Sequence, residues 1–193
     1  MKRVISYSII VFLIIMQYSC QKDVFLYKEF SCQMTTSDVV KETVEDFKNS
    51  FSVEVPKHWN TKLYYDNLQS EIFTADTLKT LNNSYIMDLS MINATIDINN
   101  LFKEKVYTVT QSEGLQTIQD NFIKFKKNKA YYHLGKGIDN NQELHVFQCY
   151  IKLSEDFYFL AKTEIYGQEN VDERLCESFE VLNSLKFIDD NDN

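Results

Sequence analysis

The chain has 193 residues, with 28 acidic and 20 basic side chains and a formal charge of −8 at neutral pH. A chain this acidic is repelled by nucleic acid, because nucleic-acid binding needs lysine and arginine to neutralise phosphates. Only four glycines occur, and the G-x-x-x-x-G-K-[ST] and G-x-G-x-x-G loops that bind phosphates are absent. The length suits one domain with a hydrophobic core and is short for two.

The first twenty residues have the pattern of an export signal. Lys2 and Arg3 precede an apolar run from Val4 to Met16, which is shorter than the roughly 20 residues of a membrane-spanning helix. A lone cysteine, Cys20, follows this run. The pattern resembles the bacterial lipoprotein signal, which implies that residues 1–19 are removed and that Cys20 carries a lipid. The alternatives are a signal without lipid and an uncleaved anchor.

Three further cysteines, Cys32, Cys149 and Cys176, could form a disulfide in an oxidising compartment. Cys149 falls in an expected strand and Cys176 in an expected helix that should pack near it, so Cys149–Cys176 is the candidate bridge. The alternative is that these thiols are buried as small apolar side chains. No C-x-x-C motif indicates a zinc site or thioredoxin-like chemistry.

The segment before the first strand has two expected parts. Residues 20–35 show no clear period and should form a lipidated tether. Residues 36–50 should form a helix, because apolar side chains recur at helical spacing. These side chains are Val40, Val44 and Phe47.

Alternation of apolar and polar residues predicts a strand over 51–55. Pro56 lacks a backbone donor, so it should end this strand or leave it on the edge of a sheet. Trp59, the only tryptophan, follows this turn, and its side chain should pack at one end of the hydrophobic core. Two further extended stretches are expected at 61–65 and 70–75.

Residues 85–98 should form a long strand, with a bulge or burial on both faces where the apolar phase shifts. Asn99 or Asn100 should cap a helix that ends near Gln111. The apolar residues expected on its buried side are Phe102, Val106 and Val109.

The second half should be a sheet of four strands followed by a helix. The strands are expected at 116–127, 129–135, 143–152 and 157–166. If the last loop has an even number of residues, Tyr150 lies opposite Phe159 and His145 opposite Glu164. Apolar groups on both strand faces predict layers on both sides of the sheet.

The closing helix should run to about Ser184. Asn170 and Glu173 form a capping-box-like pair at its start. Its apolar stripe consists of Val171, Leu175, Phe179 and Leu182. Residues 190–193 are polar and should form a disordered tail.

Three landmarks stand out: Phe51-Ser-Val-Glu-Val-Pro-Lys-His-Trp59, Phe157-Tyr-Phe-Leu160 and Ser178-Phe-Glu-Val-Leu-Asn-Ser-Leu-Lys-Phe187. Together they resemble the PsbP-like family, although His58 stands where many relatives carry glycine. The resemblance implies an α+β fold in which helices sandwich a central antiparallel sheet, and we expect this single domain to span residues 36–189. It implies proteins that bind or assemble other proteins without a shared active site, so no functional residue is transferred.

The residues that could support catalysis are scattered. The three histidines, His58, His133 and His145, lack the spacing of a metal site, and no metal or cofactor is expected. No G-x-S-x-G turn occurs, and Cys149 and His145 are too far apart along one strand to share a proton. A basic cluster at residues 124–129 is interpreted as the solvated face of a strand.

Tyrosines recur at the expected strand positions. Where exposed, they would suit a contact surface, since they combine apolar area with a polar tip. The alternative is that helices cover them. The candidates are Tyr64, Tyr65, Tyr131, Tyr132, Tyr158 and Tyr166.

These observations favour a lipoprotein anchored in the membrane of a bacterial cell envelope, which acts as a non-catalytic binding or assembly factor for another envelope protein. One alternative is an envelope hydrolase or metal-dependent enzyme, whose site would combine distant carboxylates with His58 or His145. The other is an immunity lipoprotein that neutralises a toxin.

Overall fold

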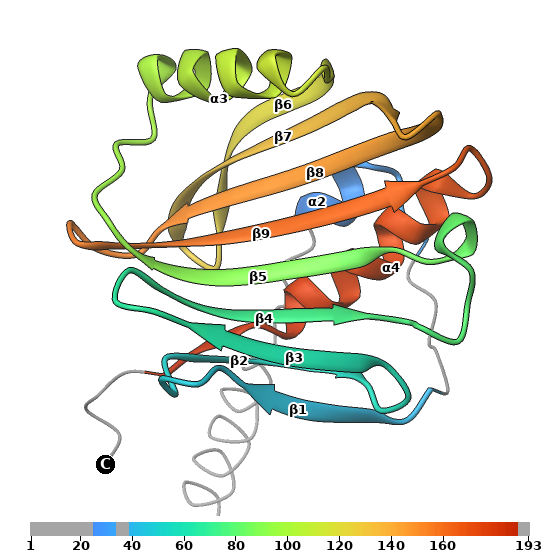
Figure 1. Cartoon of the computed structure of the whole chain (residues 1–193). Helices are drawn as coiled ribbons and strands as arrows, with labels where there is room; N and C mark the ends of the chain where they lie inside the picture. Colours follow the sequence, from blue (N-terminus) through green and yellow to red (C-terminus); the bar gives the residue numbers. More distant parts are fainter. Residues whose placement is uncertain (1–24, 34–38, 189–193) are drawn as a thin grey trace, which may run out of the picture.

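The computed structural model describes residues 25–33 and 39–188, so Cys20, the signal segment and the tail at 190–193 lie outside it. The described residues form an α+β fold with two antiparallel sheets (Figure 1). The seven-stranded sheet has the order β3-β4-β5-β9-β8-β7-β6, and the three-stranded sheet has the order β1-β2-β10. No helix in these two ranges is long and apolar enough to cross a membrane.

The elements have the following bounds: α2 (Phe25–Glu29), β1 (Lys41–Glu45), β2 (Phe51–Pro56), β3 (Asn60–Tyr65), β4 (Gln69–Ala75), η2 (Leu81–Asn83), β5 (Ile86–Asn93), α3 (Asn100–Ser112), β6 (Gln116–Phe125), β7 (Asn128–Asp139), β8 (Gln142–Lys152), β9 (Phe157–Tyr166), α4 (Val171–Ser184) and β10 (Lys186–Phe187).

Helices cover both faces of the seven-stranded sheet, which confirms the predicted αβα sandwich (Figure 1). On one face, α2 and α4 pack over a core in which the Phe147 and Phe179 rings lie 5.0 Å apart. On the other face, α3 lies against β6 and β7 and buries Val106 against Tyr131. Neighbouring residues of a strand point to opposite faces, so Tyr131 and Tyr132 are buried in different layers.

The helix predicted over residues 36–50 is wrong for the part that the structure describes. Residues 41–45 form β1, which pairs antiparallel with β2. The buried Asp46 then turns the chain, because its carboxylate accepts hydrogen bonds from the N–H groups of Lys48, Ser50 and Phe51. Strand pairing and this turn outweigh the helical spacing, and Phe47 stays 55% exposed.

Residues 25–33 were expected in the tether but belong to the folded domain. Leu26 and Tyr27 of α2 are buried. The Phe30 ring lies 5.2 Å from the Phe179 ring of α4 and 5.9 Å from the Phe147 ring of β8. The short α2 therefore contributes directly to the core.

The predicted Cys149–Cys176 disulfide is also wrong. Cys176 in α4 bonds to Cys32, which follows α2. Cys149 is buried in β8, where it pairs with Ala161 of β9. The prediction failed because it treated the segment around Cys32 as tether, whereas α2 brings that residue alongside α4.

The segment between β5 and α3 differs in part from the prediction. β5 pairs regularly with β9 up to Asn93 and then leaves the sheet, so the shift of apolar phase marks the strand end rather than a bulge. The predicted cap is confirmed, since Asn99 Oδ1 accepts from the N–H of Phe102 at 3.0 Å. Val109 is 53% exposed, and Thr110 is buried in its place.

The structure differs from two predictions for the last hairpin and helix, the pairing of β8 with β9 and the cap of α4. The loop between Leu153 and Phe157 has an odd number of residues, so the register differs by one position from the even-loop prediction. Tyr150 therefore pairs with Leu160, and His145 pairs with Ile165. At the start of α4, Asn170 has a left-handed backbone (φ 52°) and makes no side-chain cap, so the predicted capping box is absent at this helix.

Candidate binding pocket

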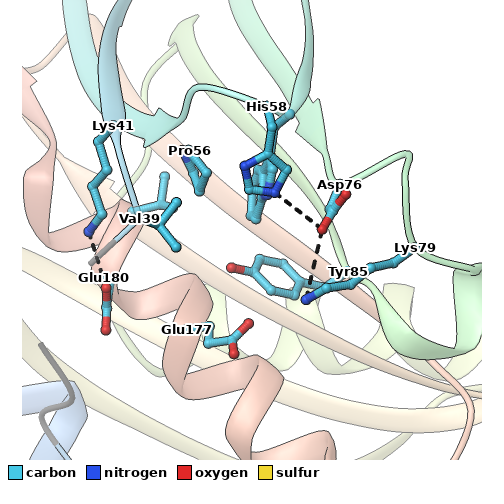
Figure 2. A pocket seen from close by; sticks show the side chains of 11 residues that line it. Val39, Lys41, Pro56, His58, Asp76, Lys79, Tyr85, Glu177 and Glu180 are labelled. Atoms are coloured by element: carbon cyan, nitrogen blue, oxygen red, sulfur yellow. Dashed lines mark hydrogen bonds and ion pairs between the residues drawn. The ribbon is translucent and has the colours of Figure 1, made fainter. Parts of the chain in front are cut away.

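A pocket of about 420 Å³ opens where the start of β1, the end of β2 and the β4–β5 connection meet the outer face of α4 (Figure 2). Segments far apart in the sequence supply its walls. The lining residues are Val39, Lys41, Pro56, His58, Trp59, Asp76, Lys79, Tyr85, Glu177, Glu180 and Val181.

The turn after β2 supplies the aromatic wall of the pocket. Pro56 is the last residue of its strand, as predicted, and its carbonyl accepts from the N–H of Trp59 at 2.9 Å. This turn places Trp59 against the core, also as predicted, with its ring 5.1 Å from the Tyr85 ring in an edge-to-face arrangement. His58, the intervening residue, is exposed at the rim.

Ion pairs already engage both lysines of the pocket. The buried Asp76 carboxylate lies 3.8 Å from Lys79 Nζ and 3.4 Å from His58 Nε2. Across the pocket, Lys41 Nζ lies 3.1 Å from Glu180 Oε2 (Figure 2). These pairs neutralise much of the local positive charge.

The hydroxyl of Tyr85 is available to a ligand. Its side chain is only 4% exposed, yet the hydroxyl has no hydrogen-bond partner among the residues that the structure describes. Figure 2 shows this hydroxyl directed toward Val39. Burial raises the pKa of Tyr85 well above its usual value near 10, and the carboxylates of Glu177, Glu180 and Asp76 raise it further. The hydroxyl is therefore protonated at neutral pH.

The second available group is the carboxylate of Glu177, on the outer face of α4. It forms no salt bridge within the described ranges. Partial burial raises its pKa above the usual value near 4.5; Glu180 and Glu173 raise it further, while Lys79 opposes the shift. The pocket thus presents a hydroxyl beside the aromatic wall, together with a carboxylate that no described residue pairs with.

A second depression of about 400 Å³ continues this surface along α4, sharing Lys79 and Glu177 with the pocket. Its buried Arg174 is held by the fold, since Nη1 and Nη2 of its guanidinium donate to three backbone carbonyls at 2.6–2.8 Å. Glu169 and Glu173 also line this depression. Carboxylates therefore dominate the accessible side chains along this face of α4.

The structure does not bring the three histidines together. His58 lines the pocket, His133 is buried on β7 beside the Thr117 hydroxyl, and His145 is buried on β8 near Glu143. Within residues 25–33 and 39–188, no group of three or more histidine, cysteine, aspartate or glutamate side chains could hold a metal ion. Sequence reasoning found His58 but missed Asp76, Tyr85 and Glu177, which converge only through the fold.

The six tyrosines do not share one surface. Tyr64 and Tyr65 on β3 are exposed, whereas Tyr158 and Tyr166 on β9 are half-buried. Tyr131 and Tyr132 cannot be contact residues, since both are buried in the two layers that cover the sheet. The alternative that helices cover the tyrosines therefore holds for this pair.

No family model and no curated protein sequence matches the chain. Solved structures do resemble it. The Ran-binding protein Mog1p of Saccharomyces cerevisiae aligns with a TM-score of 0.53 and 12% identity, over 79% of this chain and 97% of Mog1p. CyanoP, the PsbP protein of Synechocystis, aligns with a TM-score of 0.50 and 13% identity, over 82% of this chain and 99% of CyanoP. A structure from Bacteroides thetaiotaomicron aligns with a TM-score of 0.50 and 8% identity, over 81% of this chain and 51% of that protein. These similarities establish the PsbP-like fold that the sequence landmarks predicted.

Proposed function

We propose that this chain is a lipoprotein, anchored through Cys20 in a bacterial cell envelope, that binds another envelope protein without catalysis. The pocket would receive a lysine or arginine side chain of that partner. One observation carries the proposal: the Tyr85 hydroxyl and the Glu177 carboxylate, neither of which has a partner among residues 25–33 and 39–188, lie in one pocket beside Trp59.

A basic side chain matches each part of this pocket. Its charged head forms charge-assisted hydrogen bonds with Glu177, and the Tyr85 oxygen can accept another. Its apolar stem and its charge are both favourable beside the Trp59 ring. The acidic chain as a whole would steer a basic partner toward it.

Two further observations support the envelope location and the binding role. The Cys32–Cys176 disulfide suits an oxidising compartment outside the cytoplasm. The fold is one that Mog1p, a Ran-binding protein, also has. A toxin that offers a basic side chain would be one such partner, which would make the chain an immunity protein.

The only tryptophan of the chain lies in the pocket, so its fluorescence reports binding directly. We expect N-acetyl-arginine amide to change this fluorescence saturably and its uncharged analogue N-acetyl-citrulline amide to leave it unchanged. Glu177→Gln should weaken arginine binding about tenfold, an effect of roughly 1.4 kcal/mol that is typical of a hydrogen bond to a charged group. Glu104→Gln, an exposed change on α3, is the matched control. Equal responses to both ligands would refute the proposal.

The lipid anchor is tested separately in cells. Cys20→Ser should abolish labelling by a fatty-acid analogue and release the protein from the membrane fraction. A chain that keeps both its label and its membrane association after this change would exclude lipidation at Cys20.

A second candidate function is acid–base catalysis, because the pocket holds two groups of raised pKa, Tyr85 and Glu177, beside the His58–Asp76 pair. No serine, threonine or cysteine is among the described lining residues, so nucleophilic catalysis by those side chains finds no support there. His58→Ala should leave arginine binding within twofold if the pocket only binds. If the pocket catalyses a hydrolysis, the same change should abolish turnover.

A further inference from the structure

The chain enters the folded domain at the C-terminal end of α4. Cys32 is bonded to Cys176 in the middle of that helix, whereas Tyr27 contacts Phe179 and lies beside Asn183, further along it. α2 therefore runs antiparallel to α4, and its first residue, Phe25, lies near the end of α4. The disulfide and the packing of α2 hold this entry point in place.

Only residues 21–24 separate Cys20 from α2. Five steps of a fully extended chain span at most about 18 Å. A lipid on Cys20 would therefore keep the C-terminal end of α4 close to the bilayer surface.

Four turns gather at this end of the molecule, which we name the turn end: the β1–β2, β3–β4, β6–β7 and β8–β9 turns. The antiparallel register brings three of them together, since Gln69 pairs with Ile92 and Asn93 pairs with Phe157. The β1–β2 turn joins them through Lys48, whose Nζ donates to the Asp66 carbonyl at 2.7 Å. Figure 1 shows the β1–β2, β3–β4 and β8–β9 turns on the left.

The turn end exposes large apolar side chains. Phe47 and Tyr65 stack with ring centroids 3.9 Å apart and are 55% and 57% exposed. Leu68 is 64% exposed, and Phe157 and Ile188 are also exposed. Aromatic and aliphatic side chains of this kind are favoured at the boundary between lipid headgroups and acyl chains.

Charge at the turn end is mixed. The β6–β7 hairpin exposes Lys124, Lys127 and Lys129, whereas the β8–β9 turn exposes Glu155 and Asp156. These lysines belong to the basic cluster at residues 124–129, and their exposure agrees with a solvated strand face. A contact made by this end therefore depends on apolar insertion, with only a small part from attraction to anionic lipid.

We propose that the turn end rests on the membrane surface and that the acidic pocket points away from it. This inference depends on the proposed lipid at Cys20. We choose a lipid surface as the partner of these apolar side chains because the connection of residues 21–24 is short. It leaves little room for a second protein between the turn end and the bilayer. The pocket lies at the opposite ends of these strands, beside the start of β3 and the end of β4, where it can reach a partner.

Two exposed leucines in turns provide a matched test. Leu68 lies in the β3–β4 turn, and Leu78 lies beside the pocket in the β4–β5 connection and is 80% exposed. Leu68→Cys and Leu78→Cys, each in the full processed lipoprotein, would carry a nitrobenzoxadiazole probe. The proteins would be placed in phosphatidylethanolamine–phosphatidylglycerol vesicles that contain brominated lipid.

We expect the probe at position 68 to shift to the blue and to be quenched at least fivefold more strongly than the probe at position 78. Equal quenching at both positions, or stronger quenching at position 78, in protein that floats with the vesicles would overturn the orientation alone. Protein that does not float would overturn the lipid anchor and the orientation with it.

Discussion

The inward and outward faces of α4 differ in how fully their side chains are satisfied. On the inward side, Phe179 is completely buried among aromatic rings, and Cys176 is cross-linked to the segment that follows α2. On the outward side, Glu177 has no ion-pair partner within the described ranges, and the nearby Tyr85 hydroxyl has no hydrogen-bond partner there. A group that the fold leaves unsatisfied is available to a ligand, so the inward face should control stability and the outward face binding.

The largest effect should come from removing the disulfide. Cys32 and Cys176 are 144 residues apart, and opening so long a loop in the unfolded chain corresponds to about 5 kcal/mol in the chain-entropy model. We expect the double change to serine to lower the free energy of unfolding in urea by about that amount. Wild-type protein in excess reductant should behave similarly, and Cys149→Ala, which keeps the disulfide, is the control. Equal stability of the oxidised and reduced forms would contradict this role of the bridge.

A pair of alanine changes compares the two faces directly. Phe179→Ala should lower the free energy of unfolding by about 3–5 kcal/mol, because it leaves a cavity among Tyr27, Phe30 and Phe147. Glu177→Ala should change it by no more than about 0.5 kcal/mol, as is usual for an exposed position. Urea denaturation at pH 7 measures both. Similar losses for the two variants would remove the distinction between the faces.

The raised pKa of Glu177 predicts a pH dependence on the outward face. A carboxyl group whose pKa is higher in the folded than in the unfolded chain stabilises the fold while protonated; this contribution is complete below the unfolded pKa and is lost as pH rises through the folded pKa. Glu177→Gln should therefore be slightly more stable than wild type at pH 7 and equal to it below about pH 4. Urea denaturation across this range checks the sign.

Arginine binding should show the opposite pH trend, because it needs the ionised carboxylate. Affinity should begin to fall at a higher pH than an unperturbed glutamate would predict, since burial raises the pKa of Glu177. Trp59 fluorescence titrations at several pH values measure this, and affinity that stays constant down to the usual glutamate pKa would argue against a role for Glu177.

Among the changes at buried positions, Tyr85→Phe should have a smaller effect on stability than Phe179→Ala. The lost hydroxyl has no hydrogen-bond partner among the described residues, so the free energy of unfolding should change by less than about 1 kcal/mol. Affinity for N-acetyl-arginine amide should nevertheless fall about threefold to tenfold, because a ligand contact is removed. An unchanged affinity would show that the hydroxyl does not contact the ligand.

Local patterns in the sequence predicted most of the elements. The alternation in β2, the cap at Asn99 and the apolar stripe from Leu175 to Leu182 all agree with the structure, because each depends on residues only a few positions apart. The helix predicted over residues 36–50 failed because its weak local spacing competed with pairing to β2, which no local pattern reveals. The predicted pairing of β8 with β9 is wrong because a loop that is one residue longer or shorter shifts every residue pair of the hairpin.

The sequence by itself determined the export signal pattern, the layers on both faces of the sheet and the aromatic turn at Trp59, since short-range periodicity and composition specify them. Only the tertiary structure decided that Cys32 is the partner of Cys176 and that Asp76, Tyr85 and Glu177 share one pocket. The physical reason is separation along the chain. Contacts between residues about a hundred positions apart depend on how sheets and helices pack, and that arrangement leaves no repeating trace in the sequence.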